Sequence, residues 1–347
     1  MVMIGIDPHK RTHTAVAIDD REVVVAERLV HARCGQAAEL VAWADEFDGG
    51  DRTWAIESAG GLGYLLAQQL LASGEHVVDI PAMLASRVRL LGSGRSQKND
   101  PNDARSVAIA ALRTPELIVV RVEDHATVLR LLSRRHSQIA QARNKAVCRL
   151  HALVGELVAG GITKQLVVSR AFSLLESLEP VGAVARERQR LAFELLDDVD
   201  RYDRQRKDMN RRIREAVAAS GTSLTDIFGV GDVIAATLIG HTGDITRFAT
   251  ADKFAAYNGT APIEWSSGNP KRPTHRLSRR GNRTMNHALH IAAVTQLRHA
   301  HSPGRAFYDR KRAEGHTTKN GIRALKRRIS NVVYRHLVAD NQRVSSN

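Results

Sequence analysis

The order of short apolar runs in the N-terminal part of the chain constrains the fold more than any other feature. Three strand-like runs, at 2–6, 14–18 and 22–29, are separated by the turn-like segments PHK and DDR. Helix-like stretches then alternate with two further strand-like runs at 53–57 and 76–80. The order β-β-β-α-β-α-β predicts a mixed sheet with helices on its faces.

Carboxylates stand at the ends of these predicted elements. Asp7 ends the first strand in an otherwise apolar run, and Glu57 ends the strand TWAIE. Asp100 and Asp103 are three residues apart at the start of the next predicted helix, so both lie on one helical face. Each acid alone is explained by a turn, the surface or a helix N-terminus. Together, carboxylates from two strands and one helix are typical of a hard-oxygen site that binds one or two Mg²⁺ for phosphoryl transfer.

The middle of the chain is predicted to be helical. A packed helix over 103–113 has Asn99 or Asp100 as its N-cap, and two long, strongly charged helices are expected near 126–158 and 184–219. Two sets of residues recur every seven positions: Leu132, Ile139, Ala146 and Leu153, and Leu195, Tyr202, Met209 and Ala216. This spacing predicts a coiled-coil-like hairpin or dimerisation arm, with an ordinary helix bundle as the alternative.

A pair of glycines opens the last third of the chain. Gly229 and Gly231 stand between two apolar, helix-like pieces. The pattern is typical of a helix-hairpin-helix, whose free backbone N–H groups hold a phosphate of a nucleic-acid backbone. A bare corner between two helices uses the same residues, so this alternative stays open.

Charge is unevenly distributed along the chain. The formal net charge is +14, and the residues after position 250 alone contain 19 Lys and Arg against 5 Asp and Glu, so the whole excess lies there. A turn-rich basic segment of this kind indicates a nucleic-acid partner more than a membrane surface. A solvated basic tail is the simpler alternative.

The cysteine and histidine residues exclude several kinds of site. The two cysteines, Cys34 and Cys148, cannot form a disulfide framework or a four-thiolate zinc site. His287 and His290 share a helical face but lack the further ligands that zinc needs. Without a membrane-spanning run or a signal peptide, a soluble, cytoplasmic protein is expected.

Four segments together resemble the DEDD transposases of the insertion-sequence one-ten family, relatives of the pilin-gene invertase. They are MIGIDPHKRTHTAVAI, TWAIES, VVDIPAMLASRVRLLGSGRSQKNDPNDA and FAAYNGTAPIEWSSGNPKRPTHRLSRRGNRTMNHAL. The resemblance implies a RuvC-like, ribonuclease-H-like domain at 1–123 and a coiled-coil helical region at 124–220. A mainly helical C-terminal transposase domain with the helix-hairpin-helix would follow at 221–347.

The resemblance also assigns roles to individual residues. It places the acids of the family on Asp7, Glu57, Asp100 and Asp103, and its serine nucleophile on Ser267, directly before Gly268, with Ser266 as the alternative. Basic residues that follow can neutralise a phosphate: Lys271, Arg272, Arg276, Arg279 and Arg280. From the residues alone, SSGNP is an ordinary turn, and His275 is a helper only by position.

The function implied is a site-specific DNA recombinase of a mobile element. It would use Mg²⁺ and a serine nucleophile, act on donor and target DNA as a dimer or tetramer, and take a non-coding bridge RNA as its guide. The alternatives are a RuvC-like junction-resolving nuclease that uses metal-activated water, and a non-catalytic nucleic-acid-binding scaffold. A sugar-kinase-like ATPase ranks last, because Pro8-His9-Lys10 stands where such a fold needs a glycine-rich loop.

Overall fold

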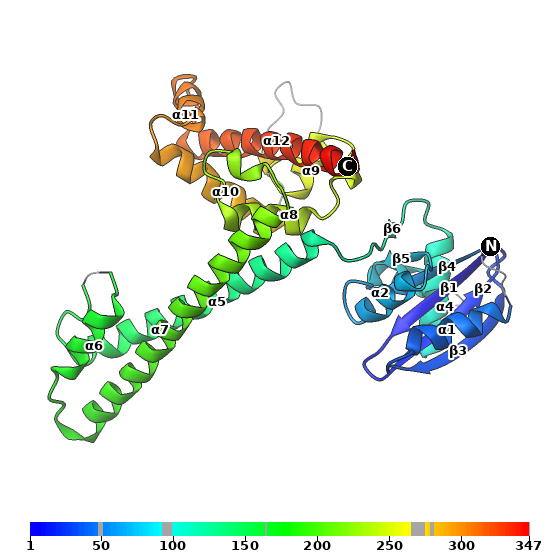
Figure 1. Ribbon diagram of the computed structural model, residues 1–347, viewed down its shortest axis with the longest axis horizontal. Coiled ribbons are helices and arrows are strands. Elements are labelled where there is room, and N and C mark those ends of the chain that lie inside the picture. The colour runs from blue at the N-terminus through cyan, green and yellow to red at the C-terminus, as the bar shows by residue number, and fades with distance from the viewer. Residues whose placement is uncertain (48–50, 92–98, 164, 265–274, 278–280, 347) are drawn as a thin grey trace. The chain divides into compact units, whose positions relative to one another are not determined.

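The structure is a computed structural model, and it divides into two compact units, Met1–Glu123 and Asp124–Asn347 (Figure 1). It describes all residues of the chain except 48–50, 92–98, 164, 265–274, 278–280 and 347. Among the described helices, none is long and apolar enough to cross a membrane.

The first unit is built on a mixed sheet. Its described strands run in the order β3-β2-β1-β4-β5-β6. The strands are β1 (Val2–Pro8), β2 (Thr12–Ile18), β3 (Val24–His31), β4 (Arg52–Glu57), β5 (Val77–Ile80) and β6 (Ile118–Val119). β1, β2 and β3 form an antiparallel meander, whereas β4 runs parallel to β1 and β5 runs parallel to β4. The mixed sheet expected from the order of apolar runs is confirmed.

Helices cover both faces of this sheet. α1 (Gln36–Asp45) and α2 (Tyr64–Ala72) pack against one face, in a core that includes Ile4 and Ile6. α3 (Ala82–Leu91) and α4 (Asp100–Leu112) pack against the other, in a core that includes Met3 and Ala55. Because side chains alternate along a strand, odd-numbered residues of β1 and β4 face α4.

The second unit contains a long helical hairpin (Figure 1). Its arms are α5 (His125–Gly155) and α7 (Gly182–Ala219), with α6 (Val168–Glu176) between them in the chain. The end of α5 shares a core with α6 and the start of α7, whereas the start of α5 shares a core with the end of α7. The two arms are therefore antiparallel, and midway Arg143 Nε donates to Asp203 Oδ1 at 2.7 Å.

The heptad positions predicted on α5 and α7 are all buried or pack against a core, although most of those on α7 are only partly buried. Leu132, Ile139 and Ala146 are buried along α5. On α7 only Met209 of the expected set is buried, and the buried positions are Ala192, Leu196, Val199, Met209, Ile213 and Val217. The hairpin is present, but coiled-coil packing and a dimerisation arm stay predictions.

Short helices complete the second unit around the base of the hairpin. They are η1 (Leu224–Asp226), α8 (Asp232–Thr242), η2 (Ile245–Arg247), α9 (Ala251–Tyr257), α10 (Arg283–Arg298), α11 (Pro303–Ala313) and α12 (Thr318–Ser345). The strands β7 (Pro262–Glu264) and β8 (His275–Leu277) form an antiparallel pair. One core joins α5 and α7 to α8, α10 and α12, so the division of this unit into two domains at 220 stays a prediction.

The segment around the two glycines differs from the expected pair of helices. The piece before Gly229 is a three-residue 3₁₀ turn, η1, and the piece after Gly231 is the helix α8. Gly229 has φ +83°, and a Cβ there would lie 2.9 Å from the carbonyl oxygen of Ala292. This glycine therefore allows a close approach to α10, and the helix-hairpin-helix is not confirmed.

Candidate active site

Strand alternation places two of the predicted acids on the same face of the sheet. β1 and β4 are parallel neighbours with Ile6 opposite Ile56, so Asp7 and Glu57 are the next residues along both strands. Both are odd-numbered and face α4, unlike the isoleucines before them, which point into the other core. Asp7 is buried, with 9% of its surface exposed.

The start of α4 brings the other two acids to this face. The side chain of Asn99 accepts a hydrogen bond from the backbone N–H of Asn102, and Pro101 occupies the first turn. This cap fixes where the helix begins, so Asp100 and Asp103 both fall within its first turn. Asp103 is buried and Asp100 is exposed.

A glycine sets the distance between α4 and β1. A Cβ on Gly5 would overlap the carbonyl oxygen of Ala104 and lie 2.5 Å from the backbone nitrogen of Ala108. The helix therefore packs directly on the strand backbone. The contact joins Gly5, two residues before Asp7 on β1, to Ala104, one residue after Asp103 on α4.

The electrostatics of Asp7 show that the four carboxyl groups interact. Burial raises the pKa of Asp7 to about 6, His9 opposes this increase, and Glu57, Asp103 and Asp100 each add to it. Like charges raise a carboxyl pKa only over short distances. The structure thus brings Glu57, Asp103 and Asp100 near Asp7, where the ends of β1 and β4 meet the start of α4.

Two residues that the sequence did not single out as site residues complete the cluster. His9 lies between two of the acids, with Nδ1 3.7 Å from Asp7 Oδ2 and Nε2 3.9 Å from Asp100 Oδ1. Arg89, from α3, forms an ion pair with Asp103. The spacing of Asp7 and His9, two apart along an extended segment, was a signal for the histidine. Nothing in the sequence pointed to Arg89.

This donor set fits a divalent cation. Among the described residues, ligand atoms of Asp7, His9 and Asp100 lie within 4.8 Å of one another. Carboxylate oxygens are ligands that Mg²⁺ and Mn²⁺ prefer, and a bound cation would offset both the burial and the nearby acids that raise the pKa of Asp7. Arg89 already balances the charge of Asp103, and Asp7 and Asp100 are the acids that lie together with His9 at distances a shared ion requires.

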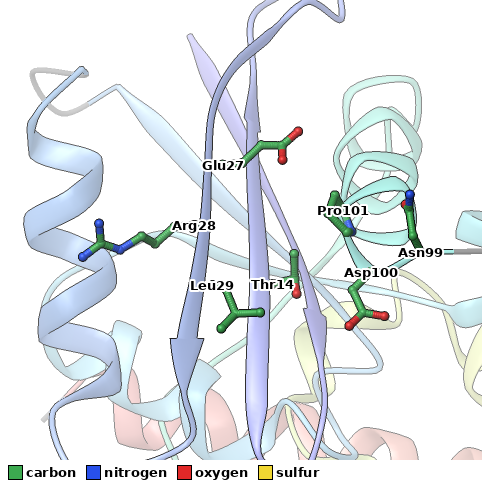
Figure 2. A pocket seen from close by; sticks show the side chains of 7 residues that line it. All are labelled: Thr14, Glu27, Arg28, Leu29, Asn99, Asp100 and Pro101. Atoms are coloured by element: carbon green, nitrogen blue, oxygen red, sulfur yellow. The ribbon is translucent and has the colours of Figure 1, made fainter.

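A hollow adjoins the cluster on the side of Asp100 (Figure 2). It has a volume of about 400 Å³ and lies between the start of α4 and the strands β2 and β3. Its lining residues are Thr14, Glu27, Arg28, Leu29, Asn99, Asp100 and Pro101. Asp100 therefore joins the buried acids to an open surface.

Comparison with known proteins identifies the family. Residues 4–158 match the DEDD transposase family of IS110, and residues 221–309 match the Transposase IS116/IS110/IS902 family, together well over half of the chain. The chain belongs to the IS110 family of DEDD transposases. It is a DNA transposase, an enzyme that cuts and rejoins DNA.

Relatives of this transposase are products of insertion elements. The IS900 42 kDa protein of Mycobacterium paratuberculosis is 27% identical over 96% of this chain and 94% of its own length. The IS116 44.8 kDa protein of Streptomyces clavuligerus is 24% identical over the same shares. The IS1111A transposase of Coxiella burnetii is 27% identical over 64% of this chain and 61% of its own.

Solved structures of RuvC from Thermus thermophilus also match. One is bound to a Holliday junction substrate, and the two are 17% and 18% identical to the chain. Each covers 35% of this chain with a TM-score of 0.27.

The C-terminal residues predicted for the transposase lie mostly outside the described residues. This holds for Ser266 and Ser267 and for four of the basic residues, Lys271, Arg272, Arg279 and Arg280. Arg276 lies in β8, where its backbone pairs with Ile263. Gly231 is the N-cap of α8, and a Cβ there would meet open space. Their roles, and the likeness to serine recombinases and the pilin-gene invertase, stay predictions.

Proposed function

We propose that this transposase of an insertion element cuts DNA by metal-dependent phosphoryl transfer at Asp7, Glu57, Asp100 and Asp103. One observation supports this most strongly: Asp7 and Glu57 lie at the ends of two neighbouring parallel strands, and ligand atoms of Asp7, His9 and Asp100 lie within 4.8 Å of one another. Such a cluster is electrostatically costly without a cation and suited to a reaction that needs one.

Mg²⁺ is the cation we propose, with Asp7, Glu57 and Asp100 as carboxylate ligands and His9 beside them. When bound, such an ion neutralises charge on the phosphate and lowers the pKa of bound water. The residues of the chain provide access to the site and hold its acids in position. Asp100 presents the site to the open hollow, and Arg89 holds Asp103 in place within the first turn of α4.

The attacking group distinguishes two versions of this function. In the first, which needs only the acids of the first unit, water attacks phosphorus, the bond from phosphorus to the leaving 3′ or 5′ oxygen breaks, and that oxygen takes a proton. This is the chemistry of a junction-resolving nuclease. In the second, which rests on the family resemblance, the hydroxyl of Ser267 attacks and a covalent protein–DNA bond replaces the broken one.

The decisive experiment combines both sites. Full-length protein is incubated with branched DNA that carries the ends of its element, with Mg²⁺ or with EDTA. Asp7→Asn and Asp100→Asn should abolish cutting at unchanged DNA affinity, and cutting by either variant at the wild-type rate would refute the acid site. Ser267→Ala and Ser266→Ala then decide the nucleophile, since loss of a protein–DNA adduct supports serine and full activity of both variants supports water.

The resemblance further supports a non-coding guide RNA, a homo-oligomer and a cytoplasmic location as parts of this proposal. The basic C-terminal part is compatible with an RNA as well as a DNA partner. Co-purification of a defined RNA that restores cutting of its matching DNA tests the guide, and a mass measurement in solution tests the assembly.

A further inference from the structure

A lysine is buried in the second unit without a carboxylate partner. Lys326, on α12, is 7% exposed, and its Nζ donates to Asn286 Oδ1 at 2.6 Å. Among the described residues, no acid forms an ion pair with it. Burial lowers the pKa of Lys326, and the neighbouring Arg323 lowers it further. A buried ammonium group is usually compensated by an anion, because water no longer solvates it.

The partner of this lysine is held in a fixed orientation. The side-chain amide of Asn286 donates to the carbonyl oxygens of Asn258, at 3.1 Å, and Gly259, at 2.8 Å. Its oxygen must therefore point toward Lys326. Gly259 has φ +72° and its backbone touches that of Gly281, so these positions leave no room for a side chain. The amine is positioned by a rigid support.

Other basic groups lie near the amine. Arg323 lies one turn before Lys326 on α12 and is exposed. On α10, the pKa of His290 is lowered by burial first, then by Lys326, and then by His287. Basic groups of α10 and α12 thus lie close to one another, and a bound anion would lower the cost of keeping Lys326 charged.

We propose that Lys326 and Arg323 bind a phosphate group of the DNA backbone on the face where α10 meets α12. The inference rests on DNA being the substrate of this transposase but not on the metal site of the first unit. Asn286 Oδ1 accepts one hydrogen bond from the ammonium group, and its other N–H groups have no acceptor among the described residues. A phosphate oxygen supplies that acceptor and the missing negative charge.

A binding role and a structural role of Lys326 have opposite consequences. If the amine only supports the fold, its replacement by a neutral side chain of similar length lowers the melting temperature. If it is kept for an anion, Lys326→Met removes an uncompensated buried charge, so the DNA-free protein melts at the same or a higher temperature while its DNA affinity falls.

The test uses the full-length protein in EDTA, so that the metal site does not contribute. Duplex DNA is titrated over a range of NaCl concentrations with wild type, Lys326→Met and, as control, Lys319→Met, an exposed position on the same helix. We expect Lys326→Met to bind roughly tenfold more weakly near physiological salt, and its log–log salt slope to fall by about 0.9, the loss of one phosphate contact. Lys319→Met should change affinity less than threefold or so.

Inorganic phosphate is the second probe and is independent of the stability of each variant. It should raise the melting temperature of wild type and of Lys319→Met but not that of Lys326→Met. Equal shifts in all three proteins, or unchanged DNA affinity of Lys326→Met, would overturn the proposal. Either result would leave cutting at the acidic cluster unaffected, so failure of this inference is distinct from failure of the proposed function.

Discussion

At the scale of single residues, Asp7 is the residue whose surroundings conflict most with its charge. It ends a buried strand, and three other carboxyl groups act on it. Its surroundings destabilise the charged form, so the folded protein holds the proton of Asp7 more tightly than the unfolded chain does. This is the reverse of an ordinary salt-bridged aspartate.

The raised pKa gives stability an unusual pH dependence. The pKa of Asp7 is about 6 in the folded protein against an ordinary value of 3.8. The contribution of Asp7 to the free energy of unfolding is therefore most favourable below pH ~4 and is lost as pH rises to about 6. Between these pH values the folded state binds a proton that the unfolded chain has released. We expect metal-free Asp7→Asn to exceed wild type by about 1–3 kcal/mol in unfolding free energy at pH 7.5.

Urea denaturation of both proteins in EDTA, at pH 4 and pH 7.5, measures this difference. It should shrink toward zero at pH 4. A difference of the same size at both pH values would show that the effect comes from packing and not from ionisation.

His9 supports a second prediction at this scale. Because both ring nitrogens lie within 4 Å of acids of the cluster, His9→Gln should weaken Mn²⁺ binding about tenfold, in line with the loss of one group beside a metal. Titration by electron paramagnetic resonance gives the affinity, and nitrogen hyperfine coupling to Mn²⁺ should vanish in the variant. His31→Gln, at an exposed position of β3, is the control. Identical affinities of His9→Gln and wild type would exclude the histidine from the site.

At the scale of secondary-structure elements, the contact between α4 and β1 determines the geometry of the acids. Gly5→Ala should force α4 away from the strand, because its Cβ would overlap the backbone of Ala104. We expect a loss of about 1–3 kcal/mol in unfolding free energy and a large loss of Mn²⁺ affinity. Gly60→Ala is the control in the same unit, since a Cβ there meets no atom within 4 Å. Retained Mn²⁺ affinity in Gly5→Ala would show that α4 can shift without disturbing the acids.

The sequence predicts the position of a residue correctly where a single physical pattern determines it. Asp7 and Glu57 could be placed because alternation in a buried strand fixes which face a residue occupies. The buried face of α7 could not be predicted from its heptads. This helix packs on both α5 and α8, so it has more than one apolar stripe and its register depends on these partners. Arg89 could not be found either, because its pairing with Asp103 depends on how two helices cross the sheet.

At the scale of the whole molecule, the two units differ in charge. Residues 1–123 contain 13 Lys and Arg against 17 Asp and Glu, whereas residues 124–347 contain 38 against 20. The unit that holds the acidic cluster therefore repels DNA at low salt, and the other unit attracts it. Under the function proposed above, we expect the second unit to supply most of the DNA affinity and the acids of the first unit to act on the DNA.

Separating the units tests this division of labour. A protease site inserted after Glu123 in the full-length protein allows the chain to be cut after folding. We expect residues 124–347 to keep DNA affinity within about threefold of the intact protein, with a similar salt slope, and residues 1–123 to keep Mn²⁺ affinity but lose DNA binding. Gel-shift and Mn²⁺ titrations of the two purified parts provide the measurement. DNA binding by residues 1–123 with the slope of the intact protein would contradict the charge argument.

The hairpin of α5 and α7 has a consequence for reach along a duplex. α5 has 31 residues, which at about 1.5 Å each make a rod about 46 Å long. The core at its tip and the core at its base are connected within the described chain by these two antiparallel helices. One full turn of B-form DNA measures only about 34–36 Å. Two DNA segments bound at the tip and at the base of the hairpin would thus lie more than one helical turn of DNA apart. Removing two turns from α5 and two from α7 should shorten that spacing by about 11 Å, or roughly three base pairs.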